Sequence, residues 1–197
     1  MPLVINDKPL KSINQFYNKR KAELQSKLGA NRKTSKRIER LTDKRNRRVE
    51  HYMHTASKRI IDLLVDHNIG TLIVGKNDGW KQESNIGKRN NQNFVQIPHA
   101  TFIEMLKYKG ELSGVNVVVT EESYTSKTSF LDNEEPVKRE SYAGRRVKRG
   151  LFKTSTGRKI NADVNGAYQI IKKVVSEAFQ GREIEGVVVH PLPLGIN

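Results

Sequence analysis

The sequence predicts an α/β protein that carries a long basic helical hairpin before its sheet. Apolar residues recur at steps of three and four through residues 11–68, as on one face of a helix. Two short β-branched runs then flank a further helical pattern, and a last helical pattern follows residue 160. The chain has 197 residues, which is enough for one sizeable domain with a core of normal size.

Residues 11–68 are expected to form the helical hairpin. Its first helix ends on Gly29, a suitable C-terminal cap. Its second helix starts at a Thr34 or Ser35 cap, ends before Gly70, and is unusually long.

The charge of the chain favours a polyanionic partner. Lys and Arg outnumber Asp and Glu by 36 to 21, which gives a formal net charge of +15. Thirteen of these basic residues lie between Lys19 and Arg48, with only three acidic residues among them. A basic helix face is often only solvated, but this excess is nearly uncompensated and favours a surface that follows phosphates. The face consists of Lys36, Arg37, Arg40, Lys44, Arg47 and Arg48.

Nucleic acid is therefore the expected partner, and a ribosomal or anionic-membrane role is the alternative. No run of about 18 apolar residues and no secretory leader is present. We expect a cytoplasmic, nucleoid-associated protein without a membrane-spanning segment. Cys is absent, which excludes disulfides, a thiolate nucleophile and a thiolate zinc site.

The pattern of residues 69–122 predicts a strand, a helix and a second strand. Thr71 to Gly75 and Val115 to Thr120 are the strands, and a helix opens at Pro98 after a polar loop with the only Trp. This order predicts a parallel pair, so Glu121 and Glu122 follow the carboxyl end of the second strand. Open α/β sheets build their sites at that edge. The two carboxylates either mark a strand that reaches solvent or serve a metal site.

Residues 123–160 are polar and rich in turn residues, and predict a long loop or a small subdomain. Its second half is basic, with Arg145, Arg146, Lys148 and Arg149. Residues 161–197 then predict a helix with Asp163 at its start, as an N-cap, and an extended tail that packs back onto the protein.

Several quoted segments resemble one family. "KPLKSINQFYNKRKAELQSKL", "TSKTSFLDNEEP" and "INADVNGAYQII" are similar to the C-terminal part of TnpB/OrfB, insertion-sequence proteins related to type V CRISPR effectors. The resemblance covers essentially the whole chain. It implies an RNA-guided DNA nuclease with DNA and guide RNA as partners. It also implies a RuvC-like domain of RNase H fold, with a mixed sheet and flanking helices, whose three acidic residues hold two Mg²⁺ ions.

The resemblance also implies site residues. Asp163 matches the acidic residue of the family's D-x-N helix, while the expected Glu after the first strand is missing at Gly75. A subset of the family places a Glu before "YTSK" instead, which is Glu122 here, with Glu121 in reserve. We expect Glu122 to replace the ligand lost at Gly75. The expected catalytic residues are thus Glu122, Asp163 and Glu121, and the metal ligands Glu122 and Asp163. Nucleic-acid contacts are expected from Arg37, Arg40, Lys44, Arg47, Arg48, Lys127, Arg145 and Arg146.

Two departures from the family pattern bear on activity. Without Cys, residues 123–160 form a degenerate zinc-ribbon region that binds no zinc, expected to be held by packing of Phe130, Leu131, Val147, Leu151 and Phe152. The family's first acidic residue stands in a D-x-G motif, which is absent here. We therefore expect the chain to begin inside the nuclease domain, without the first ligand and first strands.

These expectations leave three hypotheses. The first is the RuvC-like portion of a transposon-encoded RNA-guided DNA endonuclease, inactive alone unless a partner chain or segment supplies the missing strands. The second is a non-catalytic, basic nucleic-acid-binding remnant or regulator. The third is a ribosome-associated basic protein without a site.

Overall fold

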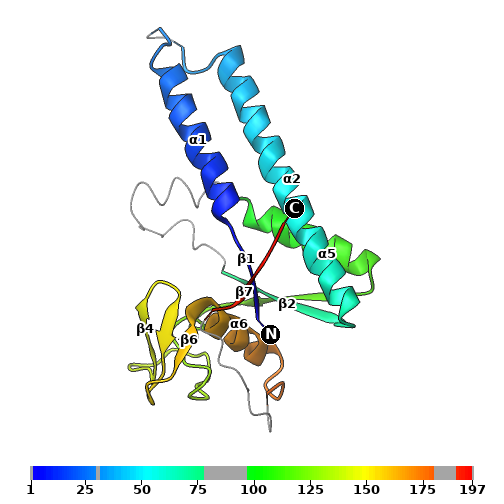
Figure 1. Cartoon of the computed structure of the whole chain (residues 1–197), viewed down its shortest axis with the longest axis vertical. Coiled ribbons are helices and arrows are strands. Elements are labelled where there is room, and N and C mark those ends of the chain that lie inside the picture. The colour runs from blue at the N-terminus through cyan, green and yellow to red at the C-terminus, as the bar shows by residue number, and fades with distance from the viewer. Residues whose placement is uncertain (1, 30–31, 78–96, 180–189, 197) are drawn as a thin grey trace. The chain divides into compact units, whose positions relative to one another are not determined.

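The computed structural model describes residues 2–29, 32–77, 97–179 and 190–196 (Figure 1). They form two compact units, which are described separately. The first contains the helices α1, α2 and α5, and the second contains most of the strands and the helix α6. The predicted loop that carries Trp80 lies outside the described residues.

The predicted helical hairpin is confirmed in the first unit. Helices α1 (Lys8–Gln25) and α2 (Lys36–Asp66) run side by side in opposite directions (Figure 1). Ser35 caps α2, since its side chain accepts a hydrogen bond from the Ile38 N–H at 3.4 Å. The prediction that Gly29 ends the first helix is wrong. That helix ends at Gln25, where the Ser26 hydroxyl donates to the Glu23 carbonyl at 2.9 Å and a turn follows.

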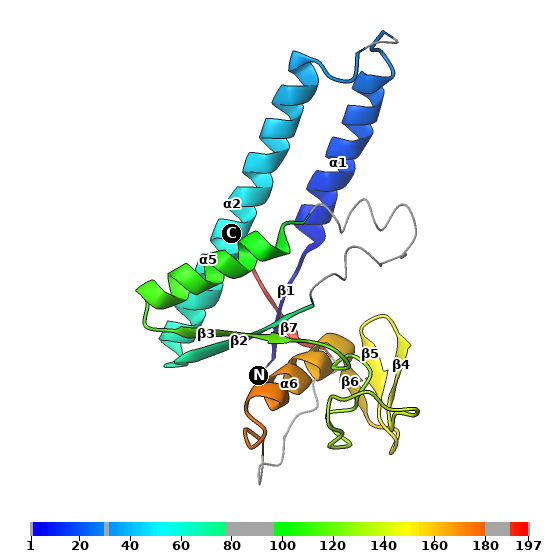
Figure 2. The same ribbon diagram turned by 180° about the vertical axis from the view of Figure 1, so that it is seen from behind.

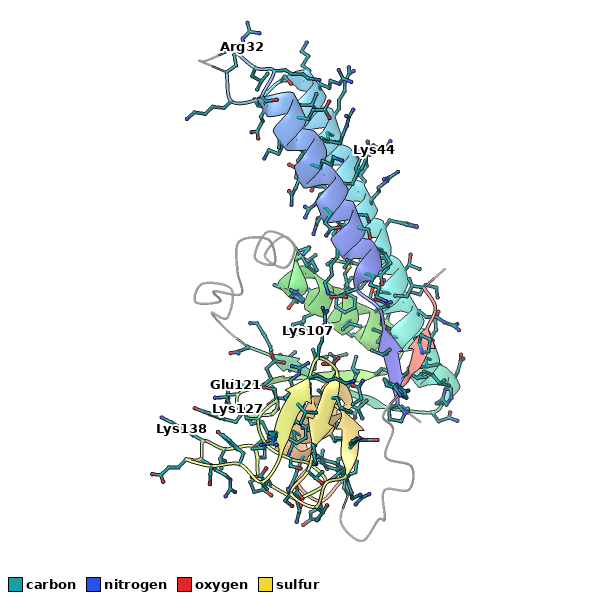
Figure 3. The ribbon with its side chains drawn as sticks, turned by 60° about the vertical axis from the view of Figure 1, so that its left-hand side comes forward. Arg32, Lys44, Lys107, Glu121, Lys127 and Lys138 are labelled. Atoms are coloured by element: carbon teal, nitrogen blue, oxygen red, sulfur yellow. The ribbon has the colours of Figure 1, made fainter. Side chains whose placement is uncertain are left out.

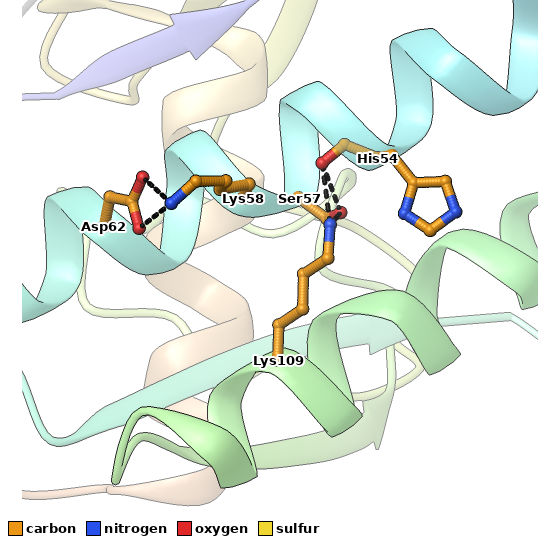
Figure 4. A network of polar contacts seen from close by, with 5 residues as sticks. All are labelled: His54, Ser57, Lys58, Asp62 and Lys109. Atoms are coloured by element: carbon orange, nitrogen blue, oxygen red, sulfur yellow. Dashed lines mark hydrogen bonds and ion pairs between the residues drawn. The ribbon is translucent and has the colours of Figure 1, made fainter.

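Helix α5 (His99–Leu112) completes the core of this unit. Lys109 holds it against α2 by donating to the Ser57 hydroxyl and to the His54 carbonyl, each at 2.7 Å (Figure 4). Burial lowers the pKa of Lys109, because an ammonium loses hydration between packed helices. The apolar core beside it comprises Leu10, Val49, Met53, Ile97 and Met105.

The second unit contains the predicted parallel pair of strands. Strands β2 (Thr71–Lys76) and β3 (Asn116–Glu121) pair in parallel, with Gly75 opposite Thr120 and Lys76 opposite Glu121. Helix α6 (Ala162–Val174) packs on this pair (Figure 2). The carboxyl ends of β2 and β3 therefore lie side by side, and the chain leaves β3 directly into Glu122.

The region between β3 and α6 is a small subdomain with a sheet that the sequence did not reveal. Strands β4 (Arg145–Lys148), β5 (Leu151–Lys153) and β6 (Lys159–Asn161) are antiparallel. Strands of three or four residues are too short for alternation to stand out among turn residues. The core under this sheet comprises Phe152, Ile160, Ala162 and Val164.

Two short terminal strands also pair. The strand β1 (Leu3–Ile5) pairs with β7 (Leu192–Leu194), which confirms that the tail packs back onto the protein. Within the described ranges, β2 has β3 as its only strand partner. None of the described helices combines the length and apolar character needed to cross a membrane.

Candidate functional site

One cleft in the second unit brings together the predicted acidic residues Glu122 and Asp163. Glu122 follows β3 and Asp163 lies in the first turn of α6, and both line a cleft of about 520 Å³. Asn77, which follows β2, lines the same cleft, as do the basic residues Lys127 and Arg146. The cleft thus combines carboxylate and amide oxygens with two cations.

Glu122 occupies the space that a side chain at Gly75 would need. A Cβ atom built on Gly75 would lie 2.9 Å from the Glu122 Oε2 atom and 2.6 Å from the Ile170 Cδ1 atom. The Glu122 N–H donates to the Lys76 carbonyl at 3.2 Å and thereby continues the pairing of β3 with β2. The carboxylate that follows β3 therefore lies at the end of β2, beside Gly75.

The environment of Glu122 differs from that of its neighbour Glu121. Burial raises the pKa of Glu122, which is half-buried and has no ion pair with any described residue. Glu121 is exposed and is not among the residues that line the cleft. A hydrogen bond with Ser123 and the Lys173 ammonium at 3.3 Å lower the pKa of Glu121. Of the two, Glu122 is the one that the structure directs into the cleft.

Asp163 is free to present its carboxylate, because another residue caps the helix. The prediction that Asp163 is the N-cap is wrong: Asn161 is the N-cap, and its Oδ1 atom accepts from the N–H groups of Asp163 and Val164. The Asp163 side chain is 72% exposed, and one of its oxygens lies 3.7 Å from a guanidinium nitrogen of Arg146. A carboxylate in the first turn is also favoured by the helix dipole.

Asn165, the last residue of the D-x-N segment, has a structural role that sequence reasoning missed. Its side chain is fully buried. Its Oδ1 atom accepts from the Phe130 N–H at 3.0 Å, and its Nδ2 atom donates to the Thr128 carbonyl at 2.9 Å. The segment that follows Glu122 is therefore tied to the helix that carries Asp163. The joint presence of the "TSKTSF" and D-x-N segments was the only sequence signal of this contact.

The degenerate zinc-ribbon region is held by carboxylates as well as by packing. Glu134 accepts from the N–H groups of Ser129 at 2.6 Å and Ala143 at 2.8 Å. Asp132 accepts from the Ser155 N–H at 3.0 Å and from its hydroxyl at 2.6 Å. These hydrogen bonds link the strand connections across the subdomain, and sequence reasoning did not foresee them.

The expected apolar packing of this region is present only in part. Phe152 is buried, and Phe130 stacks on Tyr168 with ring centroids 4.7 Å apart. The prediction for Val147 is wrong, because Val147 is 44% exposed on β4. The edge strand β4 is exposed along its whole length, so none of its side chains packs inward.

The predicted nucleic-acid residues are all exposed. On α2 they follow one another at helical spacing on the side away from the buried stripe, and Lys44 extends outward from the hairpin (Figure 3). In the second unit, Lys127 and Arg146 line the cleft, while Arg145 does not. The residues exposed on α2 are Arg37, Arg40, Lys44, Arg47 and Arg48.

The described part of the chain does not gather a complete acidic metal site. No group of three or more His, Cys, Asp or Glu side chains that could hold a metal ion occurs among the described residues. The cleft supplies two carboxylates, the side-chain amide of Asn77 and the hydroxyl groups of Ser123, Tyr124, Thr125 and Ser126.

Two family models match different parts of the chain. Residues 3–81 match the family model OrfB_IS605, described as a probable transposase. Residues 99–170 match the family model described as Cas12f1-like, TNB domain. These two matches confirm the resemblance to TnpB/OrfB proteins and their type V relatives. No curated protein matches this chain.

A solved structure shares the fold. It is the chain in "Cryo-EM structure of the Cas12f1-sgRNA-target DNA complex", similar over 84% of the present chain with a TM-score of 0.57 and 19% sequence identity. The present chain spans 42% of that protein's length. The similarity shows a mixed α/β fold of the Cas12f1 kind.

Proposed function

We propose that this TnpB-like chain is the RuvC-like nuclease portion of an RNA-guided DNA endonuclease, with its phosphodiester site in the cleft of Glu122 and Asp163. The observation that carries the proposal is that Glu122 fills the space over Gly75 and shares a cleft with Asp163. The OrfB_IS605 match supports the class of protein. The Cas12f1 protein of similar fold is titled as a complex with sgRNA and target DNA, which supports RNA and DNA as partners.

The donor atoms of the cleft fit Mg²⁺. Carboxylates of Glu122 and Asp163 and the amide oxygen of Asn77 are hard donors, which Mg²⁺ prefers. Mg²⁺ in nucleotide-processing sites commonly keeps several waters and uses one or two carboxylates together with substrate phosphates. Bound there, the ion would supply charge stabilisation for phosphodiester hydrolysis.

The chain's own residues contribute binding and orientation. Lys127 and Arg146 line the cleft and are placed to contact phosphate oxygens of a strand that enters it. The exposed cations of α2 offer a longer surface for a nucleic-acid backbone. Asn165 ties the segment after Glu122 to α6, the helix that carries Asp163.

We propose further that this chain cleaves DNA only when a partner chain or segment supplies a third carboxylate. The described cleft has two carboxylates where the family's site uses three, so metal binding should be weak. The open edge of β2 among the described residues offers a place for a partner chain or segment that brings a third.

A second candidate function is binding without cleavage. It is favoured by the same lack of a third acidic ligand among the described residues, together with the exposed basic face of α2. In this case the cleft would bind no metal and the chain would act as a remnant or regulator that occupies nucleic acid.

Manganese binding separates the two functions. Mn²⁺ affinity of the full chain, measured by electron paramagnetic resonance, is expected to fall on the order of tenfold or more in Glu122→Gln and in Asp163→Asn, because each removes a charge that faces the cation. Glu121→Gln is the control and should retain the affinity. If neither substitution changes the Mn²⁺ affinity, the proposed nuclease site is ruled out and the function of binding without cleavage remains.

Cleavage assays complete the test. The chain is incubated with Mg²⁺ or Mn²⁺, guide RNA and labelled single- or double-stranded DNA. We expect binding without products from the chain alone. Products from the chain alone that vanish in Asp163→Asn would show a nuclease that needs no partner.

A further inference from the structure

Arg146 connects the basic and the acidic parts of the cleft. It lies on β4, and its guanidinium is 3.7 Å from the Asp163 carboxylate at the start of α6. Both residues line the cleft, and Lys127 is the other cation there. Within the described residues, Arg146 is the only cation paired with a predicted ligand that faces the cleft.

The backbone that carries Arg146 is held in place. Gly144, which precedes β4, lies so close to Phe152 that a Cβ atom there would be 2.4 Å from a ring carbon. Phe152 is itself buried and pairs with Arg146 across the β4–β5 ladder. The ladder shifts register between Arg146 and Lys148, and such irregularities turn side chains away from plain alternation. The packing of this backbone places the base of the Arg146 side chain beside the cleft, within reach of its guanidinium.

The ion pair itself is weak and open to exchange. The Arg146 and Asp163 side chains are 48% and 72% exposed, and the separation of 3.7 Å exceeds that of a good charge-assisted hydrogen bond. A guanidinium stays charged at any physiological pH and binds phosphate through two parallel hydrogen bonds. A phosphate in the cleft therefore competes with Asp163 for Arg146, and a divalent cation competes with Arg146 for Asp163.

We propose that Arg146 exchanges between Asp163 and a phosphate of the bound nucleic-acid strand, so that strand binding frees the carboxylate for the metal. This inference rests on the proposed metal and phosphodiester site. Without nucleic acid, Arg146 neutralises Asp163 and opposes metal binding. With nucleic acid in the cleft, Arg146 moves to the phosphate and the full charge of Asp163 faces the metal. Because such coupling is reciprocal, metal binding strengthens strand binding by the same factor.

The test is the Mn²⁺ affinity of the full chain with and without a single-stranded oligodeoxynucleotide. The wild-type affinity should rise when the oligonucleotide is added. In Arg146→Gln it should be higher than wild type without DNA, by up to about fivefold for an exposed pair, and should rise less on adding DNA. The matched control is Arg145→Gln, which removes an equal charge from the same strand outside the cleft.

Each outcome is decisive. Equal Mn²⁺ affinities for the Arg146→Gln and Arg145→Gln chains would overturn the exchange, because any difference from wild type would then reflect net charge alone. A wild-type affinity that does not respond to DNA would overturn it as well. Failure of the proposed metal site can be distinguished from failure of the exchange, because Mn²⁺ affinity would then be unchanged in Glu122→Gln and Asp163→Asn.

Discussion

At the scale of single residues, the position of the Glu122 side chain depends on the absence of a side chain at Gly75. Gly75 has no Cβ, and an oxygen of the Glu122 carboxylate lies only 2.9 Å from where that atom would be. Both strand ends meet at the same cleft, so the carboxylate that follows β3 lies beside the end of β2.

The first prediction concerns Gly75→Ala. The added methyl group would displace the ends of the Glu122 and Ile170 side chains, because both lie within 3.0 Å of its position. Mn²⁺ affinity should fall toward that of Glu122→Gln, with little change in folding. The double variant Gly75→Glu with Glu122→Gly should recover part of the affinity, since it returns the carboxylate to β2.

The control for this prediction is Gly166→Ala. Gly166 also lines the cleft, but a Cβ atom there meets nothing within 4 Å. This change should leave Mn²⁺ affinity intact and stabilise α6 by up to about 1 kcal/mol, since alanine is the better helix former. Equal effects of both alanine substitutions on Mn²⁺ binding would contradict the packing of Glu122 over Gly75.

The second prediction concerns Asn165→Leu. Leucine leaves the buried Phe130 N–H and Thr128 carbonyl without partners, which costs about 1–3 kcal/mol for each group. Asn161→Ala removes only an N-cap, which costs about 1 kcal/mol. Urea unfolding should therefore rank Asn165→Leu as clearly more destabilising. The reverse order would show that the cap, and not the buried amide, holds α6 to the subdomain.

At the scale of elements, carboxylate hydrogen bonds stabilise the small subdomain between β3 and α6. Burial by itself would raise the pKa of Asp132, but the nearby Ser129 side chain, the hydrogen bonds from Ser155 and the charge of Arg158 outweigh burial and lower it. A carboxylate with a lowered pKa stabilises the folded state above its unfolded pKa, near 3.9. This stabilisation is lost as the pH falls through the lower folded value.

The third prediction follows from the lowered pKa of Asp132. Asp132→Asn should lower the melting temperature at pH 7, and the difference from wild type should shrink as the pH falls below the unfolded pKa and disappear once Asp132 is protonated in the folded state as well. Asp43→Asn, which changes an exposed carboxylate of α2, is the control and should have little effect. A difference that stays constant from pH 7 to pH 3 would mean that Asp132 acts by shape and not by charge.

The fourth prediction concerns the basic face of α2. Changing Arg37, Arg40, Lys44 and Arg48 together to Gln should weaken binding to all sequences alike and reduce the log-log salt slope by up to about four. The control removes four cations that already pair with carboxylates within the same unit: Lys11, Arg20, Lys58 and Lys107. Equal slopes for the two variants would show that the face is only solvated.

The elements differ in how well the sequence predicts them. Helix α2 and the pair β2 and β3 follow from long periodic or β-branched runs with clear boundaries, such as the Ser35 cap. Strands β4 to β6 escape prediction because their order depends on Phe152 and on contacts with residues twenty or more positions away. The same holds for the cap of α6, where Asn161 and Asp163 are equally good candidates in sequence and only the backbone decides.

At the scale of the whole molecule, the acidic cleft and the apolar hairpin core lie in different units. The cleft belongs to the unit of β2, β3 and α6, and the core of α1, α2 and α5 belongs to the other. Glu122 and Asp163 were predicted as ligands from family motifs. The contact of Arg146 with Asp163 was not predicted, because a contact between a short hairpin and the start of a helix produces no periodic pattern in the sequence.

The last prediction concerns association. Among the described residues β2 pairs only with β3, and β1 pairs with β7 rather than with β2. Among the described residues no second strand lies along residues 71–75, and a strand edge without a neighbour favours pairing with a further strand. We expect the chain to self-associate, or to bind a chain that supplies strands, once salt screens its net charge of +15.

Light scattering at increasing protein concentration, together with hydrogen exchange across residues 71–74, measures this. Thr71→Lys should reduce association, because a lysine on an exposed edge disfavours strand addition. Thr34→Lys, an equal change at an exposed position before α2, is the matched control. A chain that stays monomeric at all concentrations while residues 71–74 exchange fast would show that the edge does not recruit a strand. The third carboxylate would then have to reach the cleft by another route.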